Sequence, residues 1–217
     1  MIRCSSISQI MTNPRAKGET WSETAKGAML EAVRESLFGV RKNLDDVRAI
    51  QKGRACEDEG IQIYNDVFLY DLKKVNSDGR RNNGIITGEP DLVAASSRKG
   101  VDIKVAWSLL TFPLNEEMCD KKGYEWQARG YMCLFDLPEW EIAYCAIDTP
   151  DNILRDYDER AIHVIDSAIP MHHRITIARY TRDLEIEKAM LEKCALANEW
   201  IDNAISQFAI DHDKYLI

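Results

Sequence analysis

The chain has 217 residues and a formal net charge of −8, with 45% hydrophobic residues. These values fit one compact domain and at first argue against a nucleic-acid binder, because a net negative charge repels a polyanion. No apolar run reaches the roughly 18 residues of a membrane span, and the opening residues lack the apolar run of a secretion signal. We therefore expect a cytoplasmic protein without membrane contact, and its six cysteines, which form no C-x-x-C pair, to be reduced thiols.

The charge is unevenly distributed along the chain. Residues 1–56 carry a balance of +4, residues 57–150 carry −7 and residues 151–217 carry −5. The basic excess is therefore N-terminal, and the carboxylates concentrate in the middle.

The N-terminal part, residues 1–70, is predicted to be helical. Ser22 precedes apolar residues at helical spacing that end near Gly39, which predicts a first helix. A second helical region follows over residues 44–70, interrupted or bent near Gly53.

The middle of the chain changes to β-like patterns. Turn signals at residues 76–79 and 82–84 are followed by three short runs rich in β-branched and aliphatic residues. We expect neighbouring strands over 85–87, 91–94 and 101–105, with residues 96–100 joining the last two as a hairpin.

The remaining elements alternate between helix and strand. Helices are predicted over 122–135, 150–167 and 183–208, and strands over 140–147 and 174–178. The pattern predicts one α/β domain over 1–217, with a small mixed sheet flanked by helices and additional helices at both ends. Its core is expected at about 53–148, followed by a helix-strand-helix unit over 150–217.

The residues with the clearest chemical signal are Asp91, Asp102 and Lys104. An acid-x-Lys triplet alone means little, because chance predicts about two and the chain has three, at Asp71/Lys73, Asp102/Lys104 and Asp120/Lys122. The middle triplet differs because it lies in a strand, where Asp102 and Lys104 share one face. The hairpin brings Asp91 beside Asp102.

Two such neighbouring carboxylates predict a divalent cation, since they repel each other without one. Mg²⁺, for which Mn²⁺ would substitute, could bind Asp91, Asp102 and the carbonyl of Ile103, as one or two ions. The metal would polarise a phosphate and acidify a water, and Lys104 could position the attacking hydroxide. This chemistry fits phosphodiester hydrolysis. The alternative is an exposed ion pair across an ordinary hairpin.

Two flanking motifs add a family resemblance. Gly53-x-x-x-Glu57 looks like the helix that precedes the catalytic core of PD-(D/E)xK nucleases of the RecB-like and lambda-exonuclease-like groups, and Gln127-x-x-x-Tyr131 is similar to their following Q-x-x-x-Y helix. The resemblance implies a restriction-endonuclease-like core. It also implies that Glu57 binds metal and that Gln127 and Tyr131 position water or phosphate. Glu59 is the alternative to Glu57, because a helix register cannot be read to one residue.

The N-terminal segment also resembles the YqaJ-like phage alkaline exonucleases, or viral recombinases. This implies a Mg²⁺-dependent 5′-to-3′ exonuclease that resects duplex DNA ends, works with a single-strand annealing protein and often forms a trimer in the host cytoplasm. The family's 5′-phosphate pocket uses Arg, Ser and Trp side chains. Arg15, Trp21 and Ser22 are of these types, without a position-by-position match.

Further basic residues are candidates for contacts to DNA phosphates. They lie in turns or helix ends beside the predicted site, where charge can equally reflect solvation alone. The candidates are Arg15, Arg54, Arg80, Arg81, Arg98 and Lys99.

Two other functions remain open. The first is a Cas4-like or RecB-like nuclease of different polarity, although the scattered cysteines do not suggest the four-cysteine cluster of Cas4. The second is an inactive DNA-binding module on the same fold. For any DNA-binding reading, the net charge of −8 predicts that binding requires a divalent metal.

Overall fold

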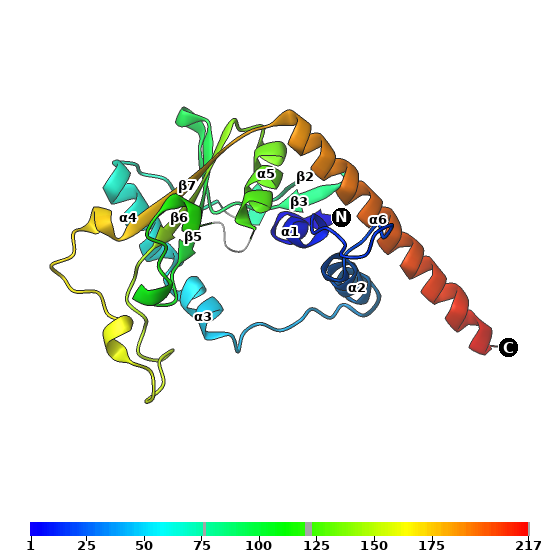
Figure 1. The fold of residues 1–217 in the computed structure, drawn as a ribbon, viewed down its shortest axis with the longest axis horizontal. Helices are drawn as coiled ribbons and strands as arrows, with labels where there is room; N and C mark the ends of the chain where they lie inside the picture. Colours follow the sequence, from blue (N-terminus) through cyan, green and yellow to red (C-terminus); the bar gives the residue numbers. More distant parts are fainter. Residues whose placement is uncertain (76, 120–122, 217) are drawn as a thin grey trace.

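A four-stranded sheet is the centre of the computed structural model, which describes residues 1–75, 77–119 and 123–216. Its order is β4 (Leu92–Ala94), β5 (Lys99–Val105), β6 (Glu139–Cys145) and β7 (Ile175–Thr181). β5 pairs antiparallel with β4 and parallel with β6, and β7 is antiparallel to β6. The fold is thus a mixed α/β architecture, as predicted (Figure 1). The predicted hairpin is confirmed as the antiparallel pair β4–β5.

The strand predicted at 85–87 lies in a different sheet from the one expected. β3 (Ile86–Gly88) pairs in parallel with β1 (Ile2–Arg3) and antiparallel with β2 (Arg81–Asn82), in a separate three-stranded sheet. The prediction that it neighbours the hairpin is wrong. Pro90 follows β3 and lacks the N–H that would continue a ladder, so the chain leaves one sheet before it enters the other.

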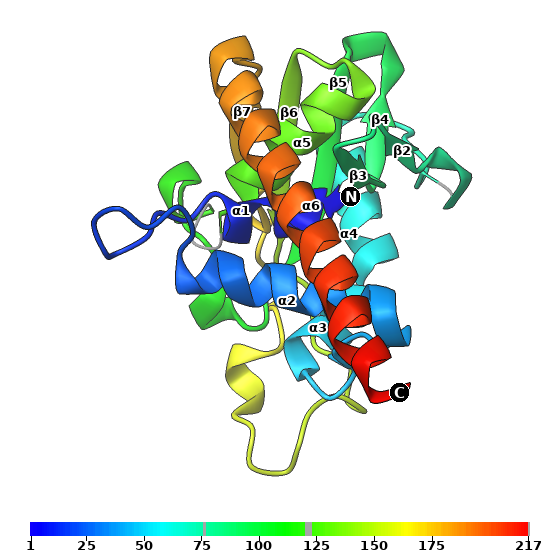
Figure 2. The same ribbon diagram turned by 90° about the vertical axis from the view of Figure 1, so that its right-hand side faces the viewer.

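Helices cover both faces of the four-stranded sheet. α4 (Glu57–Phe68) packs Ile61 and Tyr64 onto the face that carries Val101 and Ile103. α5 (Tyr124–Phe135) covers the opposite face. Beyond α5 lie α1 (Ile7–Ile10), α2 (Glu23–Phe38) and the long α6 (Leu184–Asp213), which together close the larger core (Figures 1 and 2).

The N-terminal helices begin and end largely where the sequence predicts. The Ser22 hydroxyl accepts a hydrogen bond from the Ala25 amide (2.9 Å) at the start of α2, and Gly39 ends the helix with a φ of 66°. The region 44–70 contains α3 (Arg48–Ala55) and α4. They are separated at Cys56, three residues after the predicted break at Gly53.

The helix predicted over 150–167 is wrong. This segment forms turns and one short 3-10 helix (Arg160–Ile162). Aspartates compete with helical hydrogen bonding here: Asp148 accepts from the Ile165 amide and Asp158 from the Arg155 amide, both at 2.8 Å.

The C-terminal strand and helix are confirmed as β7 and α6, and α6 extends to Asp213. Within the described residues, no helix is long and apolar enough to cross a membrane.

Candidate active site

The hairpin β4–β5 brings two aspartates together at the edge of the central sheet. Leu92 pairs with Val101, so Asp91 and Asp102 lie opposite each other one step further along the register. The Asp91 Oδ2 atom accepts a hydrogen bond from the Ile103 amide (2.8 Å). Because the N–H and C=O of an extended residue point to the same side, the Ile103 carbonyl also faces the Asp91 edge.

Asp102 is a buried carboxylate with incomplete hydrogen bonding. Its exposed fraction is 2%, and its Oδ2 atom accepts no hydrogen bond among the described residues. The Lys104 ammonium lies against this oxygen as an ion pair. The same ammonium lies 4.9 Å from the centre of the Tyr124 ring on α5. The Lys104 ammonium is thus the one partner of this oxygen among the described residues.

The local electrostatics favour a bound cation. Burial, with the nearby charge of Asp102, raises the pKa of Asp91 to about 8. Burial alone would lower the pKa of Lys104, but Asp102 and Asp91 outweigh that effect and raise it. Two acids and one lysine therefore hold one excess negative charge when both acids are ionised. A divalent cation would relieve this repulsion.

Glu57 is near this pair and is held by a different lysine. It is the first residue of α4, and its Oε2 atom lies 2.6 Å from Nζ of Lys74. The Glu57 charge also contributes to the raised pKa of Asp91, whereas Glu59 is exposed and acts on Lys52. The structure thus turns Glu57, rather than Glu59, toward the aspartates.

The three carboxylates among the four predicted metal ligands do not form a closed cluster. Across residues 1–75, 77–119 and 123–216, no three His, Cys, Asp or Glu side chains are arranged to hold a metal. Asp91 and Asp102 form a pair, and Glu57 remains with Lys74.

Gln127 and Tyr131 lie on one face of α5, as their spacing predicts. The Gln127 amide donates to the Tyr131 hydroxyl (3.2 Å), which donates to the carbonyl of Glu89 (2.9 Å). Tyr131 stacks on Trp140 at 4.8 Å, and burial followed by the charge of Asp102 raises its pKa. The pair therefore connects α5 to the segment that leads into Asp91.

A glycine permits this close packing. A Cβ atom at Gly88 would lie 2.6 Å from both the Tyr131 ring and the Cys4 sulfur. Only glycine lets β3 approach Tyr131 this closely.

Two of the residues predicted to contact DNA, Arg80 and Arg81, lie in the segment that precedes Asp91. Arg80 pairs with Glu89 (3.1 Å), and Arg81 lies 4.5 Å from the centre of the Phe135 ring. Both are positioned on the chain that runs into Asp91 through β2 and β3.

The other basic candidates are dispersed. Arg54 pairs with Asp45 at 2.6 Å, and Arg98 is exposed in the hairpin connection with a φ of 51°. Arg15 is exposed in the loop after α1. Ser22, at the end of this loop, caps α2. The structure does not bring Arg15, Arg54 and Arg98 together with the aspartates.

Lys99 lies on the opposite face of β5 from Asp102. Its side chain is 12% exposed and pairs with Glu141 at 3.1 Å. Because side chains alternate along a strand, Lys99 points toward α4, and Lys104 points toward α5.

The other two acid-x-Lys triplets provide a contrast. Asp71 and Lys73 form an ion pair at 2.6 Å in which both side chains are more than 80% exposed. Asp120 and Lys122 lie outside the described residues. Burial therefore distinguishes Asp102/Lys104 from Asp71/Lys73.

Sequence reasoning missed three contributors to the site. They are the Lys74 ammonium, the Tyr124 ring and the Glu89 carbonyl. Tyr124 could have been found from its position one turn before Gln127 on the same helix. Lys74 lies in a connecting segment without periodicity and carries no such signal.

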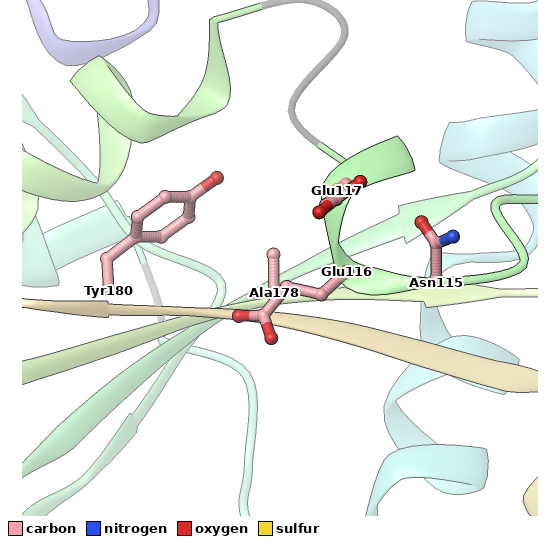
Figure 3. A pocket seen from close by; sticks show the side chains of 5 residues that line it. All are labelled: Asn115, Glu116, Glu117, Ala178 and Tyr180. Atoms are coloured by element: carbon pink, nitrogen blue, oxygen red, sulfur yellow. The ribbon is translucent and has the colours of Figure 1, made fainter.

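A separate hollow lies at the β7 edge of the same sheet face. Figure 3 shows it lined by side chains of the segment before α5 and of β7. Glu116 already has a hydrogen-bond partner there, because it accepts a hydrogen bond from the Arg179 amide at 2.7 Å. The lining residues are Asn115, Glu116, Glu117, Ala178 and Tyr180. Its two carboxylates disfavour a phosphate, and it lies two strands away from Asp102.

Solved structures similar to this chain include exonucleases. A phage-related exonuclease from Haemophilus somnus 129PT is 30% identical, with a TM-score of 0.87 over 95% of this chain and 96% of that one. An alkaline exonuclease from Laribacter hongkongensis, LHK-Exo, is 13% identical, with a TM-score of 0.71 over 99% of this chain and 94% of that one. The structure of LHK-Exo in complex with dAMP gives a TM-score of 0.72 at the same identity and coverage. No protein-family model and no curated protein sequence matches the chain.

Proposed function

Because this chain belongs to the family of phage-related exonucleases, we propose that it is a Mg²⁺-dependent DNA exonuclease that degrades one strand of duplex DNA from its ends in the 5′-to-3′ direction. Mn²⁺ would substitute for Mg²⁺, as one or two ions. The single observation that carries the proposal is the carboxylate pair Asp91/Asp102 on one hairpin, with Lys104 beside it.

The residues present fit a hard divalent cation. The buried Oδ2 atom of Asp102 has no partner among the described residues other than the Lys104 ammonium, and the charge of Asp102 contributes to the raised pKa of Asp91. The Ile103 carbonyl faces the same edge and provides a third oxygen. Mg²⁺ prefers carboxylates and carbonyl oxygens and retains several waters, so two aspartates and one carbonyl suffice as protein ligands. When bound, the metal would polarise the phosphate and lower the pKa of a coordinated water.

Lys104 orients the water and stabilises charge. Because Asp102 and Asp91 raise its pKa, Lys104 is an ammonium at neutral pH in the metal-free protein. An ammonium donates hydrogen bonds, so it can hold the attacking oxygen in place and stabilise the charge that develops on the phosphoryl oxygens. Tyr124 limits the motion of this ammonium on its other side.

In this proposal, Gln127 positions water or phosphate at the DNA strand that is cleaved, and Tyr131 holds the segment that carries Asp91. Tyr131 donates to the Glu89 carbonyl and so fixes the backbone two residues before Asp91. Gln127 is half-buried on the same helix face, and its amide can donate to water or phosphate. Their predicted positioning role is part of this proposal.

The substrate and the partners in this proposal are inferred from the family, because the aspartates alone do not specify them. The LHK-Exo structure with dAMP is consistent with a deoxynucleotide product. We extend the proposal to a single-strand annealing protein as partner, a trimeric assembly and action in the cytoplasm of a phage host. The N-terminal balance of +4 provides positive charge for binding duplex DNA.

The test is a linear duplex labelled separately at each 5′ and each 3′ end, incubated with Mg²⁺ beside a closed circular control. Early release of the 5′ labels with intact circles is expected. Lys104→Ala should abolish release, and Lys73→Ala, in the exposed triplet, should not. Release of 3′ labels first would overturn the polarity, cutting of circles would make the protein an endonuclease, and full activity of Lys104→Ala would overturn the site.

A further inference from the structure

Lys74 forms an ion pair with Glu57, a predicted metal ligand, and no sequence motif identifies this lysine. Its Nζ atom donates a 2.6 Å hydrogen bond to Oε2 of Glu57, and the charge of Asp91 also acts on it. The Lys74 side chain is 48% exposed, against 24% for Glu57. The Lys74 side chain is therefore also more exposed than that of Lys104, which is 22% exposed.

The backbone on both sides of Lys74 is anchored to the elements that carry the acids. Leu72 exchanges two hydrogen bonds of 3.0 Å with the Asn65 side chain on α4, the helix that begins at Glu57. The Val75 amide donates to the Asp91 carbonyl (2.8 Å). The position of Lys74 is thus set by both halves of the site, and its side chain can move while its backbone stays in place.

The ammonium and a metal ion would compete for Glu57. Mg²⁺ binds carboxylate oxygens at about 2.0–2.1 Å, and a cation already hydrogen-bonded to the same carboxylate repels it. This competition accounts for the arrangement in the described residues, in which Asp91 and Asp102 are paired and Glu57 is retained by Lys74.

This inference rests on the proposed metal-dependent function. We propose that Lys74 takes the place of the metal at Glu57 in the metal-free protein. Metal binding then releases Lys74, which contacts a backbone phosphate of the DNA. After release, the anchored backbone keeps the ammonium at the rim of the site, where the substrate must enter. A cation there neutralises one phosphate charge. Lys74 thus couples metal binding to DNA binding and belongs to the substrate-contacting residues.

The first arm measures binding of Mg²⁺ alone, without DNA, by isothermal titration calorimetry. Lys74→Gln removes the competing charge, so its affinity for Mg²⁺ should rise by about three- to tenfold over the unsubstituted protein. Lys73→Gln, the adjacent exposed lysine that pairs with Asp71, should leave the affinity unchanged. Lys74→Arg, which keeps the charge, should also stay close to the unsubstituted protein.

The second arm measures affinity for an end-bearing duplex in Ca²⁺, which is used to prevent cleavage, at several NaCl concentrations. Lys74→Gln should bind DNA more weakly, with a slope of log K against log salt smaller by about one, whereas Lys73→Gln keeps the full slope. An unchanged metal affinity or an unchanged slope for Lys74→Gln would overturn the role of Lys74 and leave the nuclease assignment intact. Absence of Mg²⁺ binding in both the unsubstituted protein and Lys74→Gln would instead overturn the proposed metal site, and this inference with it.

Discussion

Charged side chains are buried on both faces of β5, but the two faces differ in how the buried carboxylates are partnered. On the α4 face, the Glu141 cluster consists of Glu141, Tyr64, Lys99 and Arg179, and both carboxylate oxygens are partnered: Tyr64 donates to Oε2 at 2.6 Å, and Lys99 and Arg179 each lie 3.1 Å from Oε1. On the α5 face, the Asp102 cluster consists of Asp91, Asp102 and Lys104, so two acids share one lysine.

This difference separates structural from functional charge. A buried carboxylate with all its partners present stabilises the packing of α4 on the sheet, because removing any partner leaves a charge uncompensated. A buried acid pair that lacks a counter-cation costs free energy in the metal-free protein. Such a cost is retained at sites that bind a ligand. Substitutions on the two faces should therefore differ in their effects on reaction rate and on stability.

The largest expected effect is on catalysis, from the Asp102 cluster. Asp102→Asn should lower kcat by about a thousandfold, the upper range for removing one preorganised electrostatic group. Its free energy of unfolding should not fall, because Asp91 and Lys104 then balance each other in charge. Nuclease rates and urea unfolding measure the two quantities, with Asp71→Asn in the exposed triplet as the control. A loss of stability matching the loss of rate would remove the distinction between the faces.

The Glu141 cluster should respond in the opposite way. Glu141→Ala leaves Lys99 buried without its carboxylate and should lower the free energy of unfolding by about 3 kcal/mol. Under conditions where the variant is folded, kcat should remain close to that of the unsubstituted protein, because Glu141 faces away from the Asp102 cluster. Glu139→Ala, two residues earlier on β6 and exposed, is the matched control. Equal destabilisation by the two substitutions would show that the cluster contributes nothing specific.

The sequence predicted the elements that carry local signals. The Ser22 cap, Gly39 and the β4–β5 hairpin follow from residue types whose conformational preferences act over a few positions. The placement of Asp91 beside Asp102 followed from the strand pairing expected of that hairpin.

The elements that sequence reasoning missed depend on contacts between distant parts of the chain. β1 is two residues long, and only its pairing with Ile86 makes it a strand. Lys74 reaches Glu57 across 17 positions because Asn65 and Asp91 anchor its segment. The segment 150–167 is held in part by Asp148, which precedes it and accepts a hydrogen bond from the Ile165 amide 17 positions away, and no helical periodicity reveals such a contact.

A third expected effect is a pH dependence of stability that arises from the Asp102 cluster. The pKa of Asp91 is about 8 in the folded chain, above its value of about 3.9 when unfolded. Between these values the folded state binds more protons than the unfolded state, so stability falls as pH rises from about 4 to about 8 and levels off above.

Unfolding in EDTA at each pH measures this slope, which for one proton cannot exceed about 1.4 kcal/mol per pH unit. Asp91→Asn should flatten it, because the titrating group is gone, and saturating Mg²⁺ should also flatten it in the unsubstituted protein by stabilising the ionised pair. Glu141→Ala should retain the slope, since its cluster lies on the other face of β5. If Asp91→Asn showed the same slope as the unsubstituted protein, the uncompensated charge would have to reside elsewhere, and the contrast between the two faces would lose its physical basis.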